Sequence, residues 1–142
     1  MTGRLRNERG ATAVEFAFVV PLLLALVLGI VEFGHAFQVQ GTLSAAAREG
    51  VRAMALRNDP AEARNVVRTA AASLAPAITD DQIDIEIVDG TGTRIGTGET
   101  CPTTGAGSTA VRLTITYPKP YLTGFFGSEI ELTGTGVMRC NG

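Results

Sequence analysis

The chain has 142 residues, no tryptophan, 6% aromatic residues and 17 glycines, so a soluble core has to be built mainly from aliphatic side chains. A chain of this length has room for one modest domain. The formal net charge is −2, and the 12 basic residues are scattered without a basic stripe interleaved with aromatics, which excludes a typical nucleic-acid-binding surface.

The first ten residues form a short basic segment. They carry Arg4, Arg6 and Arg9 against a single acidic residue, Glu8. Basic residues that flank an apolar segment are retained on the cytoplasmic side of a membrane. We therefore expect the long C-terminal part of the chain to face the outside.

An apolar segment follows the basic one. Residues 16–31 carry no charge, and extension back to Ala11 adds only one charged residue, Glu15. A helix over residues 11–31 would be about 31 Å long, against about 30 Å for the hydrocarbon core of a bilayer. A buried core helix would show a polar face, and this segment has none. A cleaved secretory signal would end near residues 34–36, but the segment is long for a signal core and helical patterning continues beyond it. The sequence therefore predicts a membrane anchor.

Glu15 lies inside this apolar segment, where a carboxylate costs about 2–3 kcal/mol and usually has a partner. One interpretation is a partly hydrated side chain near the membrane surface. The other is an ion pair with a nearby cation. A free amine at Ala11 would lie one helical turn away, on the same chain or on a neighbouring one. That amine exists only if the chain is cut after Gly10.

Residues 9–16, R-G-A-T-A-V-E-F, resemble the processing site of type IV pilin-like precursors. Such precursors have a short basic leader that ends in Gly, a cut before a small residue and a Glu at the fifth mature position. The resemblance places the cut between Gly10 and Ala11, and it implies that Glu15 takes part in subunit pairing.

The wider N-terminal sequence is similar to the TadE-like family of tight-adherence (Tad/Flp) pilus proteins. The residues that carry this similarity are 13–37, with Pro21 and the Glu-Phe-Gly at 32–34, and the A-A-A-R-E-G-V-R-A at 45–53. The resemblance implies a minor pilin or pseudopilin that a prepilin peptidase cuts in the inner membrane. It also implies that the chain works with other pilin-like subunits to support assembly of an adhesive pilus.

Helical patterning continues past the membrane segment to about residue 57. One face carries apolar or small residues at helical spacing, namely Val39, Leu43, Ala46, Ala47, Gly50, Val51 and Met54. Small side chains permit close approach of another element. Two interpretations remain open: the face covers the sheet of its own domain, or it contacts another subunit.

A second helix is predicted from Pro60 to about Leu74. Asp59 can cap its N-terminus, Pro60 suits the first turn, and Glu62 lies where a capping box places its acid. The helix has to end before Pro76, which cannot continue it.

After Thr79 the hydrophobic period changes to two, which is typical of strands. Alternation predicts strands over residues 83–88 and 111–117, and residues 128–140 form a third one weakened by Gly134 and Gly136.

The predicted fold class is α+β. A long N-terminal membrane-spanning helix continues into an outer domain of a second helix and a three-stranded antiparallel sheet. We divide the chain into a basic leader (1–10), the transmembrane helix with its outward extension (11–57) and an extracytoplasmic α+β domain (58–142).

Residues 89–108 form a long loop rich in Gly and Thr, and long loops are functional or mobile. Cys101 lies in this loop and Cys140 lies near the end of the chain. Two cysteines in a small domain outside the cytoplasm predict a disulfide, which would stabilise the fold by roughly 4 kcal/mol on a chain-entropy model. A metal site would lack ligands, since His35 is the only histidine and lies beside the membrane.

The sequence shows no catalytic constellation. Without a histidine in the outer domain, Ser-His-Asp and Cys-His arrangements are excluded there. Asp80 and Asp81 open a predicted strand and are interpreted as two solvated acids. The Gly-rich residues 90–98 contain no Lys and open no helix, so they are not a phosphate-binding loop. We expect no enzymatic activity, no cofactor, no metal and no small-molecule substrate.

The expected function is therefore that of a minor pilin-like component of a Tad or type IV-like pilus or secretion system. The protein would span the cytoplasmic (inner) membrane once, with its N-terminus inside and its domain outside. The alternative is an uncleaved, membrane-anchored module that binds an extracellular partner through residues 89–108. Processing of the N-terminus separates the two hypotheses.

Overall fold

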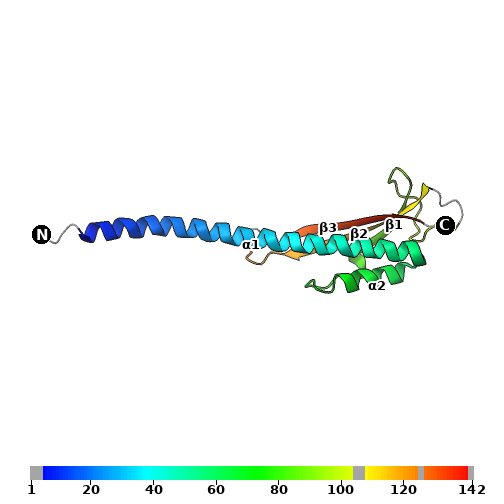
Figure 1. Cartoon of the computed structure of the whole chain (residues 1–142), viewed down its shortest axis with the longest axis horizontal. Coiled ribbons are helices and arrows are strands. Elements are labelled where there is room, and N and C mark those ends of the chain that lie inside the picture. Colours follow the sequence, from blue (N-terminus) through cyan, green and yellow to red (C-terminus); the bar gives the residue numbers. More distant parts are fainter. Residues whose placement is uncertain (1–4, 104–107, 125–126, 141–142) are drawn as a thin grey trace.

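The structure is a computed structural model that describes residues 5–103, 108–124 and 127–140, with only the backbone described for residues 5–9. In chain order the elements are α1 (Leu5–Arg57), α2 (Pro60–Ala70), the 3-10 helix η1 (Asp80–Gln82), β1 (Ile83–Val88), β2 (Ala110–Pro120) and β3 (Glu129–Arg139). The sheet and α2 gather around the C-terminal half of α1, and the N-terminal half projects away from them (Figure 1). The predicted α+β fold class is confirmed.

The two halves of α1 differ in what surrounds them. In the N-terminal half large apolar side chains are exposed, among them Phe16, Phe18, Leu22, Leu23, Leu26 and Ile30. The C-terminal half buries the stripe of small and apolar residues, from Val39 to Met54, against the sheet and α2. Of the two interpretations of this stripe, packing against its own domain accounts for its burial.

The three strands form an antiparallel sheet in the order β1-β2-β3. In the register, Ile85 lies opposite Leu113, and Leu113 lies opposite Gly136. One face of the sheet supplies the core with Ile83, Ile85, Ile87, Val111, Leu113, Ile115 and Tyr117. The period-two alternation of the sequence therefore corresponds to a buried face and a more exposed one.

Gly134 and Gly136 bring β3 into direct contact with the backbone of α1. A Cβ atom at Gly134 would lie 2.6 Å from the carbonyl carbon of Leu43, and one at Gly136 would lie 2.7 Å from the carbonyl oxygen of Ala47. No side chain fits in these positions without separating the helix from the strand. The two glycines, which the sequence pattern marks only as a weakness of the strand, are what allow α1 to pack on β3.

Three boundaries differ from the sequence-based expectation. Helix α2 ends at Ala70, about four residues before Leu74, and a turn follows it. Asp80 and Asp81 do not open the strand; they form η1, and Asp80 is ion-paired with Arg68 of α2. Strand β2 extends to Pro120, three residues beyond the predicted end.

Candidate functional site along the first helix

Within the residues that the structure describes, α1 is the one helix long and apolar enough to cross a membrane. The most apolar stretch of α1 is not buried by any other part of the described chain. Exposed apolar side chains all around a helix of this length are stable in lipid and not in water. This helix is therefore a candidate membrane span, and its exposed apolar surface favours a single-pass membrane protein.

The predicted processing residues lie at the start of this exposed half. Gly10, Ala11 and Glu15 are all exposed, and the helix runs without a break through the bond between Gly10 and Ala11. Ala11 and Glu15 are four residues apart, so they stand one above the other on the same face of the helix. No described residue forms an ion pair with Glu15. The cut itself and the pairing of Glu15 remain predictions.

A second glutamate of α1, Glu32, follows the apolar segment and is buried. Glu32 is 3% exposed and Lys119 of β2 is 2% exposed, and Lys119 Nζ lies 3.1 Å from Glu32 Oε1. The backbone N–H of Leu122 donates to both carboxylate oxygens of Glu32, at 3.0 Å each. Lys119 also donates to the carbonyl oxygen of Pro120 at 3.2 Å and lies 5.8 Å from the ring centroid of Tyr121.

These contacts lock the end of the β2–β3 hairpin onto α1 at the point where the apolar segment ends. A buried carboxylate is stable only when it is paired and its remaining lone pairs are hydrogen-bonded, and Glu32 meets both conditions. Sequence reasoning missed this pair because 87 residues separate its members. One signal was available: Lys119 is the only lysine in the chain, placed between two prolines just beyond a predicted strand.

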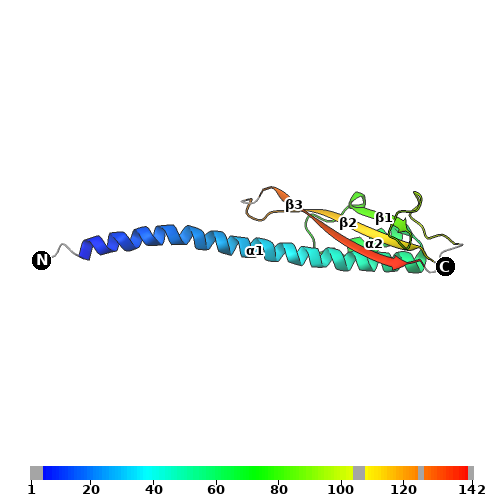
Figure 2. The same ribbon diagram turned by 90° about the horizontal axis from the view of Figure 1, so that it is seen from above.

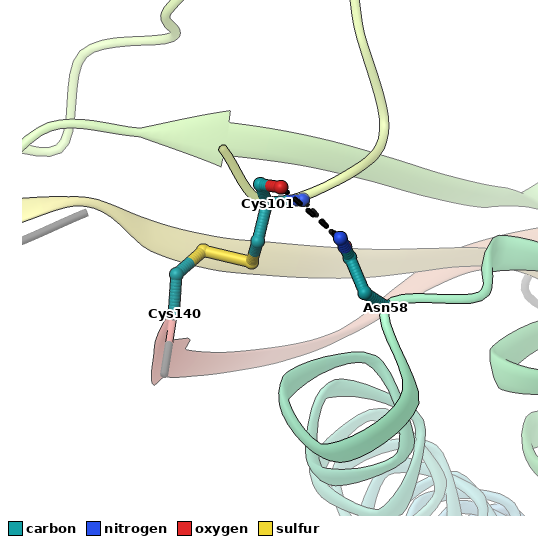
Figure 3. The surroundings of a disulfide bond; sticks show 3 residues. All are labelled: Asn58, Cys101 and Cys140. Atoms are coloured by element: carbon teal, nitrogen blue, oxygen red, sulfur yellow. Dashed lines mark hydrogen bonds between the residues drawn. A yellow bond between two sulfur atoms is a disulfide. The ribbon is translucent and has the colours of Figure 1, made fainter. Parts of the chain in front are cut away.

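The opposite end of the domain is closed by covalent and polar contacts. Cys101 and Cys140 form the disulfide that the sequence predicts, with 5.7 Å between their Cα atoms. Asn58 accepts a hydrogen bond from the N–H of Cys101 (2.6 Å) and donates one to its carbonyl oxygen (3.1 Å), as Figure 3 shows. Asn58 has a positive φ of 52°, which Asn tolerates better than most residues, and it directly follows α1. It joins the end of α1 to the disulfide.

The described part of the 89–108 loop is held to the domain by polar contacts. The carboxylate of Asp89 accepts hydrogen bonds from the N–H groups of Thr91 (2.8 Å) and Thr93 (2.9 Å). These bonds, with one from the Thr91 hydroxyl as the largest cause, lower the pKa of Asp89. Farther along, the guanidinium of Arg64 donates to both carboxylate oxygens of Glu99, at 2.6 and 3.0 Å, and this lowers the pKa of Glu99. Residues 104–107 of the predicted loop lie outside the described residues.

A metal centre finds no support in the described residues, where no group of three or more His, Cys, Asp or Glu side chains is arranged to hold an ion. His35 lies next to the membrane-exit end of the domain, where it lines a small cavity of about 300 Å³ together with Val39, Leu74 and Tyr121.

Residues 10–52 of the chain match the family model described as TadE-like protein. No curated protein and no solved structure matches the chain. The match begins at Gly10 and covers the exposed half of α1, Glu15, Glu32 and most of the half that packs on the sheet. The resemblance inferred from residues 13–37 and 45–53 is confirmed over this segment.

Proposed function

From the TadE-like segment of residues 10–52, which marks a Tad pilus-associated protein, we propose that the chain is a minor pilin-like structural subunit. A prepilin peptidase removes residues 1–10 by cutting between Gly10 and Ala11. The mature subunit sits in the inner membrane with its new N-terminus on the cytoplasmic side. There it joins other pilin-like subunits and supports assembly of an adhesive pilus or a related secretion system.

One structural observation carries this proposal: the two halves of α1 have different surroundings. The C-terminal half packs against the domain (the clamped half), and the N-terminal half is exposed (the free half). The C-terminal half of α1 is fixed by the sheet, while the N-terminal half presents apolar side chains and Glu15 to its surroundings. A helix of this kind can exchange lipid for the helices of neighbouring subunits without unfolding its domain. The exposed half is therefore the part that is available for assembly.

Glu15 gives the free half its specificity. An ionised carboxylate facing lipid is costly and is relieved by a cation that lies close by. Removal of residues 1–10 creates such a cation, the amine of Ala11, one helical turn from Glu15. Paired with the Ala11 amine of a neighbouring subunit, Glu15 would set the axial register between two helices.

The predicted orientation has independent support from the disulfide. Disulfides persist in oxidising compartments outside the cytoplasm, and Cys101–Cys140 lies in the folded domain. The basic residues of the leader favour the opposite, cytoplasmic side for the N-terminus. Both features therefore agree on a domain that faces outward.

The alternative of an anchored module that binds through residues 89–108 has less support. The described part of that loop is fixed to the domain by the Arg64–Glu99 ion pair and by the disulfide, so it is not a freely adaptable binding segment. We also propose a structural role and not a catalytic one. The only histidine in the sequence, His35, lies beside the membrane segment. It is not part of a catalytic arrangement of side chains in the sequence.

Deletion and complementation in the native host test the proposed function. Loss of the chain should reduce surface pili and adherence, and the wild-type chain supplied in trans should restore both. Unchanged piliation and adherence after deletion would contradict a role in assembly. A loss of adherence with normal pili would favour the binding module instead.

A further inference from the structure

The end of the β2–β3 hairpin lies beside Glu32, where the apolar segment of α1 ends. Leu122, in the turn between the two strands, is hydrogen-bonded through its backbone N–H to Glu32. Glu32 is the first charged residue after the apolar segment 16–31, so it marks where α1 leaves the hydrocarbon. In Figure 2 the turn of the hairpin points along α1 toward its free half. The hairpin thus ends at the level where the apolar segment of α1 ends.

Apolar side chains gather at this level. A groove of about 280 Å³ runs between α1 and β3, and it is lined by Phe33, Ala36, Phe37, Gln40, Ile130 and Leu132. Of the groove residues, Phe33 is 61% exposed and Phe37 is 75% exposed. Leu122, which lies outside the groove in the hairpin turn bound to Glu32, is 59% exposed. A cluster of large apolar side chains on the surface of a domain marks a contact with a partner or a membrane.

Helix geometry places this cluster in the interfacial layer of the bilayer. At about 1.5 Å per residue, Phe33 lies about 3 Å and Phe37 about 9 Å along α1 from Val31, the last residue of the apolar segment. The polar layer on each side of the hydrocarbon core is roughly 5–8 Å thick. Both phenylalanines therefore fall within that layer or at its outer edge.

The charges around the cluster fit the same position. Glu32, the first carboxylate after the apolar segment, is buried and paired with Lys119, so it presents no free charge to lipid. Glu129 and Glu131 are exposed and alternate with Ile130 and Leu132 along β3, so they lie on the other face of the sheet. Ile130 and Leu132 therefore lie on the face of β3 that is turned toward α1, beside the groove.

We propose that Phe33, Phe37, Leu122 and Ile130 form a membrane-contacting collar that inserts into the interfacial layer of the lipid bilayer. The collar holds the domain against the membrane surface, and the Glu32–Lys119 pair fixes the hairpin in position for it. Lipid is the occupant because the collar is continuous with the membrane segment: Phe33 follows Val31 by two residues. It requires that α1 span a membrane and does not depend on a role in pilus assembly.

Single-tryptophan variants of the full chain test the collar, since the wild-type chain contains no tryptophan. Leu122→Trp and Phe37→Trp place the probe in the collar at exposed positions. Val137→Trp is the matched control, because Val137 is 56% exposed and lies near the far end of β3. Each variant is reconstituted into phosphatidylcholine vesicles with and without lipids brominated near the carbonyl group. An intact Cys101–Cys140 disulfide and an unchanged circular dichroism spectrum report the fold.

We expect the brominated lipids to quench both collar tryptophans severalfold more strongly than the tryptophan at position 137. Iodide added to the water should show the opposite order. Equal quenching by brominated lipids at all three positions would overturn the proposal. Collar tryptophans that are shielded from iodide but not quenched by brominated lipids would also overturn it, and would indicate that a second copy of the chain covers the groove.

Discussion

Two of the glutamates of α1, Glu15 and Glu32, lie near the two ends of its apolar segment, and their surroundings differ. Glu32 is buried, ion-paired with Lys119 and hydrogen-bonded to the backbone of Leu122. Glu15 is exposed on the free half of the helix, and no described residue pairs with it. One carboxylate finds its cation within the domain, and the other does not.

Under the proposed function, this difference assigns a separate role to each half of α1. The half that carries Glu32 belongs to the domain core and gains nothing from a partner. The half that carries Glu15 has a carboxylate whose cost in lipid has to be relieved by water or by a cation that the folded domain does not supply. The comparison predicts that substitution of Glu15 affects assembly and not folding, whereas disruption of the Glu32 pair affects folding first.

Glu15→Gln is expected to have the largest effect. Without the carboxylate the Ala11 amine of a neighbouring subunit loses its partner in a low-dielectric site, and subunit association should fall by about 100- to 1,000-fold. Membrane insertion should not suffer, since a polar but neutral side chain is easier to insert. Pilus number, membrane abundance and leader removal are compared in parallel for the variant and the wild type.

Glu15→Asp serves as the matched control, because it keeps the charge and should keep part of the assembly. Normal piliation in Glu15→Gln at normal abundance would show that Glu15 is a hydrated residue near the membrane surface. The contrast between the two glutamates would then have no bearing on assembly.

Lys119→Met tests the role assigned to Glu32. It leaves the carboxylate of Glu32 buried without a cation, which should lower the Tm of the domain by about 10 °C or more. Thermal denaturation followed by circular dichroism in detergent measures the change. Replacing both residues, with Lys119→Met and Glu32→Gln together, should recover part of the loss because no charge is then stranded.

Arg68→Met is the control for Lys119→Met, since it breaks an exposed ion pair with Asp80 and should change the stability by less than about 1 kcal/mol. A Lys119→Met variant no less stable than Arg68→Met would show that the Glu32 pair does not hold the hairpin to α1.

Gly136→Ala tests how the clamped half of α1 is held. The added methyl group would lie 2.7 Å from the carbonyl oxygen of Ala47, so helix and strand have to separate, at a cost of about 1–3 kcal/mol. Urea denaturation measures this cost. Thr135→Ala, on the exposed face of the same strand, is the control and should cost much less. Equal stability of the two variants would refute the close helix–strand contact.

The smallest expected effect is on the pH dependence of stability, through the Arg64–Glu99 ion pair that holds the 89–108 loop. Hydrogen bonding from Arg64 lowers the pKa of Glu99 below its ordinary value of 4.5, so the folded state binds the Glu99 proton less tightly than the unfolded chain. The stability from this pair is fully present above pH 4.5 and is lost as the pH falls through the lowered pKa. Glu99→Gln should thus be slightly less stable than the wild type at about pH 7, with the difference vanishing in acid. A difference that persists unchanged in acid would mean that the pair does not act through the charge of Glu99.

The sequence predicted the order of helices and strands, the membrane segment and the disulfide, because each depends on a local pattern or on the number of cysteines. It did not predict where α2 ends or that Asp80 and Asp81 form a 3-10 turn, since such ends are decided by tertiary contacts such as the Arg68–Asp80 pair. The Glu32–Lys119 pair was also missed. Nothing in a linear pattern reports a contact across 87 residues.

The glycines of β3 show a second case in which a sequence pattern does not report a tertiary contact. Gly134 and Gly136 have a low strand propensity, so the sequence marks them as weak points of the strand. In the structure their missing side chains are what admits the backbone of α1. A propensity describes the isolated strand, whereas the function of these residues depends on the element that packs against them.

The first residue of the mature chain decides whether the partner of Glu15 can be an amine created by processing. Intact-mass and peptide mass spectrometry are applied to the protein extracted from the membranes of its native host. We expect a chain that begins at Ala11 and lacks residues 1–10. A mature chain that begins at Met1 or Thr2 in a host with a working prepilin peptidase would contradict it, because the amine that Glu15 requires would not exist.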